Sequence, residues 1–85
     1  MVDRDELLGE LAQLWHRMPA GGGDCMSNRC RLAAGRLIAE AEHVTEGRRF
    51  LELCNEAAWL IAETLPSATE FCRKTAGLLK MEFIE

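Results

Sequence analysis

Four cysteines and two histidines are the residues of this 85-residue chain best suited to nucleophilic or metal chemistry. Cys25 follows a run of glycines and precedes two arginines, and both a helix start and positive charge lower a thiol pKa. A catalytic cysteine also needs an oriented base, yet His16 and His43 fall on the polar sides of their predicted helices. Cys25 and Cys30 with one histidine form an incomplete zinc set. We therefore expect no catalytic residue and no structural metal at this corner.

Two other patterns resemble parts of cofactor sites. Residues 21–23 are glycines before a helix start, as at anion-binding sites. The phosphate-loop pattern also needs a second glycine followed by Lys and Ser or Thr, and these residues are not present. Glu40 and His43 form one Glu-x-x-His pair, which carboxylate-bridged di-iron bundles use twice, pointing inward. Both share a face with Arg29 and Arg36, so pairing of Arg36 with Glu40 explains them better. No cofactor is expected, and a small metal- or thiol-dependent enzyme is an alternative to the non-enzymatic role predicted below.

The third predicted helix carries an indole among carboxylates. At about 100° per residue, Glu52, Glu56, Trp59 and Glu63 share one side of that helix. An indole on a charged face is either covered by another helix or exposed to a partner, and the sequence leaves both possibilities open. Tryptophan is strongly enriched among binding hot spots, and surrounding carboxylates favour a basic partner surface. We predict these four residues as a protein-binding site.

Composition excludes several classes of partner. The formal net charge is −4 and the sequence pI is about 5.2, so general binding to nucleic acid, which rests on neutralising phosphates, is not expected. The arginines at positions 29, 31 and 36 and at positions 48 and 49 open successive helices, whose starts lie at opposite ends of an antiparallel hairpin. No apolar run approaches the roughly 18 residues that span a bilayer. The acidic first residues lack signal-peptide character, so a cytoplasmic location is expected.

Apolar periodicity predicts an all-α fold. Apolar residues make up 48% of the chain, Tyr is absent, and β-branched residues are scarce, which argues against a sheet. Leu, Ala, Phe and Ile recur at three- and four-residue spacing over four segments, about 3–18, 28–44, 46–65 and 67–82. Short connections make successive helices antiparallel. The prediction is one domain, residues 1–85, folded as a compact antiparallel four-helix bundle.

The helix boundaries rest on capping and breaking residues. Pro19 and the glycines end the first helix, and Ser27 or Asn28 is expected to cap the second. Thr45 is expected to cap the third helix, although a single glycine can be tolerated within a longer helix, so the second and third helices could also be continuous. Residues 67–70, Ser-Ala-Thr-Glu, match the capping box and predict the start of the fourth helix.

The third helix is the most apolar of the four and is expected to be central. Cys30, Cys54 and Cys72 fall on the apolar sides of their helices, so we expect reduced, packed thiols rather than disulfides. Trp15 lies centrally on the apolar arc of the first helix and is expected in the core. The expected inward positions of the fourth helix are Phe71, Cys72, Ala76, Leu78, Leu79 and Phe83.

For function, the leading expectation is a small acidic protein-binding module, a regulator or inhibitor that docks on a larger protein with a basic surface. Compact acidic chains without catalytic groups are typical of anti-defence proteins, including anti-CRISPR proteins, made by mobile elements and viruses. This expectation is based only on the small size and acidic charge that the chain shares with such proteins. The alternative is a structural homodimer whose self-interface uses the surplus apolar positions Leu32, Trp59, Met81 and Ile84.

Overall fold

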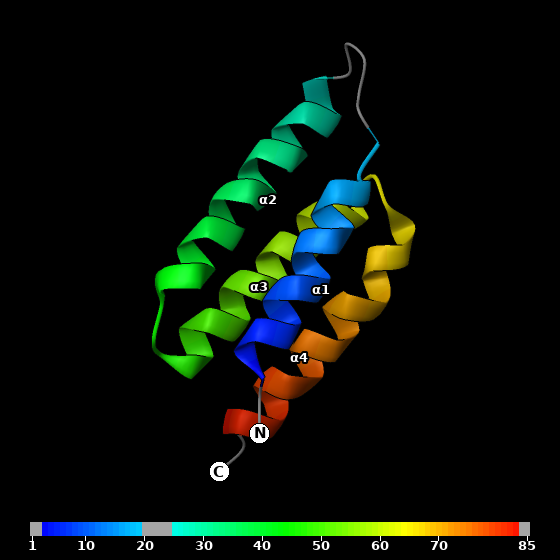
Figure 1. Cartoon of the computed structure of the whole chain (residues 1–85). Coiled ribbons are helices and arrows are strands. Elements are labelled where there is room, and N and C mark those ends of the chain that lie inside the picture. The colour runs from blue at the N-terminus through cyan, green and yellow to red at the C-terminus, as the bar shows by residue number, and fades with distance from the viewer. Residues whose placement is uncertain (1–2, 20–24, 84–85) are drawn as a thin grey trace.

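The computed structural model describes residues 3–19 and 25–83, and the side chains of all of these except residues 25–27 and 82–83. In this part of the chain there are four α-helices and no strand. Helices α1 and α3 run in one direction and α2 and α4 in the other, so that successive helices are antiparallel (Figure 1). The all-α four-helix bundle predicted from periodicity is confirmed. The helices are α1 (Arg4–Arg17), α2 (Cys25–His43), α3 (Gly47–Ala62) and α4 (Thr69–Phe83).

Helix α1 begins directly after its N-cap residue, Asp3. The carboxylate of Asp3 accepts a hydrogen bond from the backbone N–H of Glu6, with 3.1 Å between Oδ1 and N, which satisfies one of the unpaired donors of the first turn. The predicted caps of α2 are wrong, because that helix already begins at Cys25 and Ser27 and Asn28 lie inside it. An N-cap residue contributes only about 1 kcal/mol, which is too little to determine where a helix begins when other interactions favour a different start.

The second and third helices are separate. Residues 44–46 are not helical, and the N-cap of α3 is Glu46, with φ −74° and ψ 125° and no side-chain capping bond, rather than Thr45. Helix α3 ends at Ala62, three residues before its predicted end. Leu65 is extended, with φ −130° and ψ 88°, because the residue before a proline is disfavoured in the helical region.

The predicted capping box before α4 does not form. A short 3₁₀ turn, η1 (Pro66–Ala68), precedes α4, so Ser67 lies within this turn and not at the N-cap position. Proline is pre-organised for the first position of a helix, and the turn therefore begins directly at Pro66. An N-cap residue needs a non-helical backbone, which Ser67 no longer has.

Helix α3 is the central element, as predicted. It packs closely against both α2 and α4, and α1 lies against it between those two helices (Figure 1). Burial covers a wider arc of α3 than its periodicity predicts, because Leu51 and Ala58 are buried as well. The other buried residues of this helix are Phe50, Leu53, Cys54, Ala57 and Ile61.

The buried face of α4 contains one residue that periodicity did not indicate. Ala76, expected to point inward, is exposed, and Thr75 is fully buried in its place. The Thr75 hydroxyl lies 3.0 Å from the backbone oxygen of Phe71 and 3.1 Å from that of Cys72, and it accepts a hydrogen bond from the Asn55 amide at 2.9 Å. Because its polar atom is satisfied, the threonine can be buried without a large desolvation cost.

Helix α1 is held to the bundle by two arginine–aromatic pairs. The Arg4 guanidinium lies 4.4 Å from the centroid of the Phe50 ring, and that of Arg31 lies 4.4 Å from the centroid of the Trp15 ring. The Trp15 indole N–H donates to the backbone oxygen of Arg31 at 2.8 Å, and Arg31 donates to the backbone oxygen of Trp15 at 3.0 Å. Trp15 is partly buried and packs on Gly35 of α2.

Candidate functional site

Trp59 is exposed on the central helix of the bundle. Its exposed fraction is 52%, although the residues on either side of it in sequence, Ala58 and Leu60, are buried and half-buried. The structure thus decides between the two possibilities left open by the sequence, because none of the described helices covers the indole. A large exposed aromatic ring on a helix that is otherwise packed on most of its surface is a candidate contact point for another molecule.

A shallow groove of about 350 Å³ lies beside this indole. It is lined by Glu56, Trp59 and Leu60 of α3, by the C-cap residue Glu63 that follows α3, and by Leu37 of α2. We call this set the Trp59 groove. Leu37 and Leu60 lie at the edge of the interface between α2 and α3 and are partly exposed. Leu60 follows Trp59 directly in the sequence, but Leu37 belongs to another helix, and no signal in the sequence places it on this surface.

The predicted acidic stripe is divided by ion pairs. The carboxylate of Glu52 lies 3.4 Å from Arg48 Nε and 3.6 Å from Arg49 Nη1, and Arg49 also lies 3.6 Å from a carboxylate oxygen of Glu40. Glu52 is therefore largely neutralised and is not among the residues that line the groove. The structure brings Glu56, Trp59 and Glu63 together and leaves Glu52 outside this group.

The two remaining carboxylates are free to act on a partner. Glu56 and Glu63 are exposed, and within the described part of the chain neither forms an ion pair or a side-chain hydrogen bond. Both lie beside the apolar surface of Leu37, Trp59 and Leu60. The groove thus combines an apolar centre with unneutralised negative charge, which suits a partner with an apolar side chain and positive charges.

The residues considered for metal or thiol chemistry are not brought together. His16 and His43 are exposed, and Glu40 pairs with Arg49 of α3 instead of Arg36. In residues 3–19 and 25–83, no three His, Cys, Asp or Glu side chains are placed to hold a metal ion. The side chain of Cys25, which was considered and set aside as a nucleophile, lies outside the described set. Cys30, Cys54 and Cys72 are buried free thiols, as predicted.

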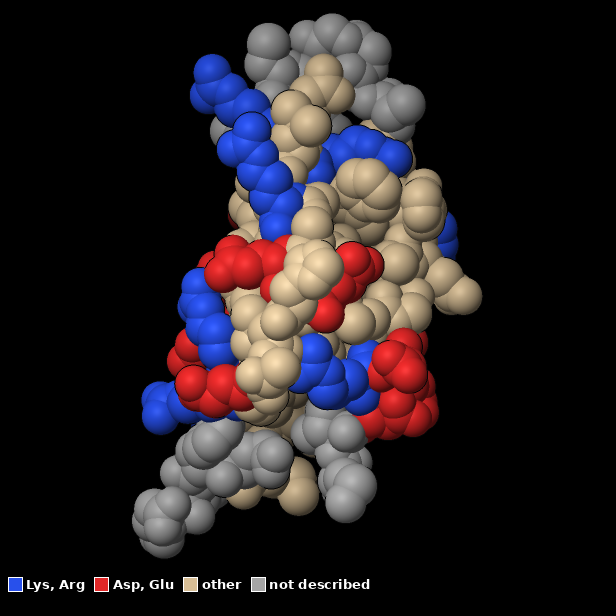
Figure 2. Space-filling view, turned by 60° about the vertical axis from the view of Figure 1, so that its left-hand side comes forward, with Lys and Arg blue, Asp and Glu red and all other residues tan. Residues whose placement is uncertain are grey.

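Positive charge forms no continuous surface on the face that α2 presents. Lys and Arg side chains gather over the upper, N-terminal part of α2, and a band of Asp and Glu separates them from those lower down (Figure 2). A phosphate backbone needs a continuous basic track for strong binding. This face does not offer one.

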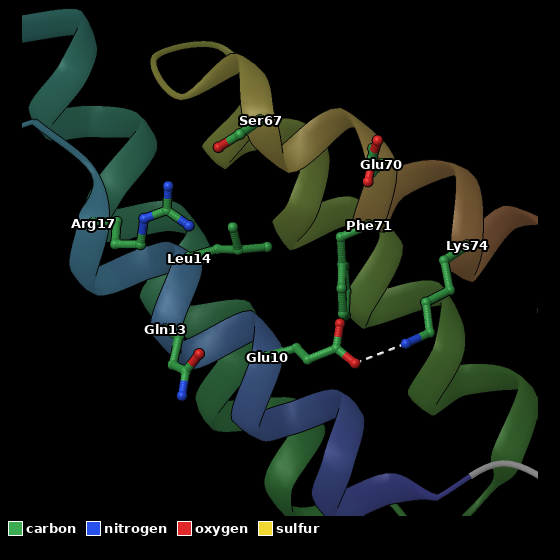
Figure 3. A pocket seen from close by; sticks show the side chains of 8 residues that line it. All are labelled: Glu10, Gln13, Leu14, Arg17, Ser67, Glu70, Phe71 and Lys74. Atoms are coloured by element: carbon green, nitrogen blue, oxygen red, sulfur yellow. Dashed lines mark hydrogen bonds and ion pairs between the residues drawn. The ribbon is translucent and has the colours of Figure 1, made fainter.

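A second hollow, of about 510 Å³, lies between α1 and α4. Lys74 Nζ and Glu10 Oε1 form an ion pair of 2.7 Å across it, and Arg17 and Ser67 lie at its other end (Figure 3). The hydrogen bond to Glu10 raises the pKa of Lys74. Phe71 and Leu14 line the space between. Periodicity within single helices does not predict this hollow, because its walls come from the first and last helices.

The walls of this second hollow do not form a reactive site. They contain no cysteine or histidine, and the exposed Glu10–Lys74 pair contributes at most about 1 kcal/mol. The hollow marks the place where α1 and α4 make little contact. The Trp59 groove is therefore the stronger candidate for a functional surface.

No protein-family model matches the chain, and neither a curated protein nor a solved structure is significantly similar to it. None of the described helices is long and apolar enough to cross a membrane. The function of the chain is therefore inferred from the geometry of its own side chains, chiefly those of the Trp59 groove.

Proposed function

We propose that the chain is a non-enzymatic protein-binding module, a regulator or inhibitor that docks on a larger protein through the Trp59 groove. The observation that carries this proposal is the exposed indole, 52% accessible, on a helix whose other large apolar side chains are buried or half-buried. A rigid aromatic ring that becomes desolvated on binding contributes more to affinity than most interface residues.

The charges beside the indole favour a basic surface on that larger protein. Glu56 and Glu63 lie at the rim of the groove, and rim charges mainly accelerate association with an oppositely charged partner. Inhibitors encoded by mobile elements or viruses, of the anti-defence type, are one setting in which a compact acidic docking module of this kind acts. The proposal assigns no catalytic residue and no cofactor.

Replacement of the indole tests this function. Trp59→Ala is expected to weaken binding to the captured partner by about 2 kcal/mol or more, the level of a hot spot, with little change in the free energy of unfolding. The partner is first captured from cells that make the protein and identified by mass spectrometry, and its affinity for each variant is then measured by calorimetry. Met81→Ala is the matched control, since Met81 is 77% exposed but does not line the groove.

Two results would contradict the proposal. Equal affinity of Trp59→Ala and the wild-type protein for the partner would place the interface elsewhere. A loss of 3–5 kcal/mol in unfolding free energy, as for truncation of a large core residue, would show that the indole supports the fold. Glu56→Gln with Glu63→Gln should slow association and flatten its salt dependence, whereas Glu52→Gln should change association little.

A further inference from the structure

The Trp59 groove restricts the kind of surface that can fill it. Glu63 directly follows the last residue of α3 and keeps a helical backbone, so it lies about 10 Å along the helix axis from Glu56, seven residues earlier. Two copies that met Trp59 against Trp59 would bring four free carboxylates together, and like charges at an interface oppose binding. The groove therefore fits a surface with two positive charges about two helical turns apart and an apolar side chain between them.

The chain itself carries such a surface on the neighbouring helix. Arg29 and Arg36 of α2 are also seven residues apart and exposed, and between them Leu32 is 66% exposed. We call these three residues the arginine stripe. Neither arginine takes part in an ion pair or a side-chain hydrogen bond in the described residues. In charge, spacing and apolar centre, the arginine stripe complements the Trp59 groove.

The arginine stripe and the Trp59 groove also face the same side of the hairpin formed by α2 and α3. At about 100° per residue, Arg29 and Arg36 lie about 80–100° around α2 from Leu37, which lines the groove. Gly35, against which Trp15 of α1 packs, lies about 160° around the helix from Leu37 and about 100–120° from the two arginines, on the side of the stripe away from Leu37. Helix α1 therefore covers neither surface.

We propose that a second copy of the chain fills the Trp59 groove with its arginine stripe, and that the two copies do so reciprocally. A twofold axis parallel to the helices lays α2 of each copy on α3 of the other, so both grooves are filled in one closed dimer. An arginine placed over the indole adds a cation–π contact, as Arg31 already makes with Trp15 within the chain.

This inference rests on the proposed function, because it uses the same groove, and it adds regulation of that groove. A larger basic partner must displace the second copy before it can reach Trp59. Self-association then lowers the apparent affinity for the partner, since only the monomer is competent to bind.

Charge reversal tests the dimer. Sedimentation equilibrium of the wild-type protein should show a monomer–dimer equilibrium. Arg29→Glu with Arg36→Glu, or Glu56→Lys with Glu63→Lys, should weaken dimerisation at least about tenfold. Arg17→Glu with Arg73→Glu, which makes the same change in net charge on α1 and α4, is the control and should dimerise as the wild type does.

A mixture of the two reversed proteins provides the decisive measurement. In the heterodimer the reversed stripe of one protein meets the reversed groove of the other, and the wild-type stripe meets the wild-type groove, so charges are opposite at both contacts. Mixing Arg29→Glu/Arg36→Glu with Glu56→Lys/Glu63→Lys should therefore restore association that neither protein shows alone. General loss of folding or of solubility would not produce this recovery.

A wild-type protein that stays monomeric, or a mixture that does not associate, would overturn the inference. The proposed function is tested separately with Arg29→Glu/Arg36→Glu, which leaves the groove intact. If this variant binds the larger partner in a Trp59-dependent manner while the wild type is monomeric, the dimer is wrong and the proposed function stands. If no binding to the partner depends on Trp59 in this variant, the proposed function fails even where the dimer is present.

Discussion

At the scale of single residues, the buried thiol of Cys54 links the core to pH. Burial raises its pKa from 9.0 to about 11, and the positive charge of Arg4 opposes this shift. The thiol is therefore neutral in the folded protein at pH values where it ionises in the unfolded chain. Its contribution to stability is complete below about pH 9 and is lost as the pH rises towards 11, because the unfolded state then releases a proton that the folded state retains.

Removal of this thiol should flatten the alkaline loss of stability. We expect the free energy of unfolding of Cys54→Ala, measured by urea denaturation at a series of pH values, to fall less steeply than that of the wild type between about pH 9 and 11. Ile61→Val, a mild core truncation that costs about 0.5–1.5 kcal/mol, should lower stability equally at every pH. Identical slopes for Cys54→Ala and the wild type would show that the thiol ionises normally in the folded protein.

At the scale of elements, the contact between α1 and α2 depends on a glycine. A Cβ atom built on Gly35 would lie 3.1 Å from Cζ2 of Trp15. That indole is held by its hydrogen bond to the backbone of Arg31 and by the guanidinium over its ring, so it has little freedom to move away. Gly9 of α1 and Gly77 of α4 have no neighbouring atom within 4 Å of such a Cβ position.

Glycine-to-alanine substitutions at these three positions should therefore change the stability of the protein in different directions. Gly9→Ala and Gly77→Ala should stabilise the protein by about 0.5–1 kcal/mol each, because alanine loses less conformational entropy in a helix. Gly35→Ala should lose this gain or destabilise the protein, and the resonance of the Trp15 indole N–H should shift in NMR spectra. Thermal unfolding of the three variants checks the order, and equal stabilisation at all three positions would mean that Trp15 repacks without cost.

At the scale of the whole molecule, packing is uneven. Helix α3 is covered by α2 and α4 along most of its length, whereas α1 makes less contact with α2 and α3 and very little with α4. The hollow between α1 and α4 reflects the same imbalance. Segments with fewer buried contacts open at a lower free energy than the core of a domain.

Hydrogen exchange should reveal this order. Backbone amides of α1 are expected to exchange faster than those of α3, and Arg4→Ala should accelerate exchange in α1 because it removes the contact with the Phe50 ring. The measurement is mass spectrometry of peptides from each helix, with α4 as the internal comparison. Uniform protection of α1 and α3 would indicate one cooperative unit and would contradict the uneven packing.

The sequence alone determined the four helices, the central place of α3 and the burial of Cys30, Cys54 and Cys72. Each follows from periodicity within one segment, because a helix turns about 100° per residue and the positions of its apolar arc can be counted directly. The sequence left open whether α2 and α3 are separate or continuous. The position of the break depends on only a few residues, and their preferences for the N-cap position contribute little free energy.

Only the tertiary structure decided which neighbouring helices cover each side of a helix. Whether Trp59 is buried depends on where neighbouring helices lie, and they leave the indole exposed. The groove beside Leu37 and the failure of the capping box at Ser67 likewise depend on contacts between segments or on the path of a turn. The ion pairs of Glu52, by contrast, are local, because Arg48 and Arg49 lie four and three residues before it in the same helix. Periodicity specifies which side of a helix is apolar, but the packing of the other helices decides how much of that side meets water, since side-chain contacts between segments are not encoded in the pattern of any one of them.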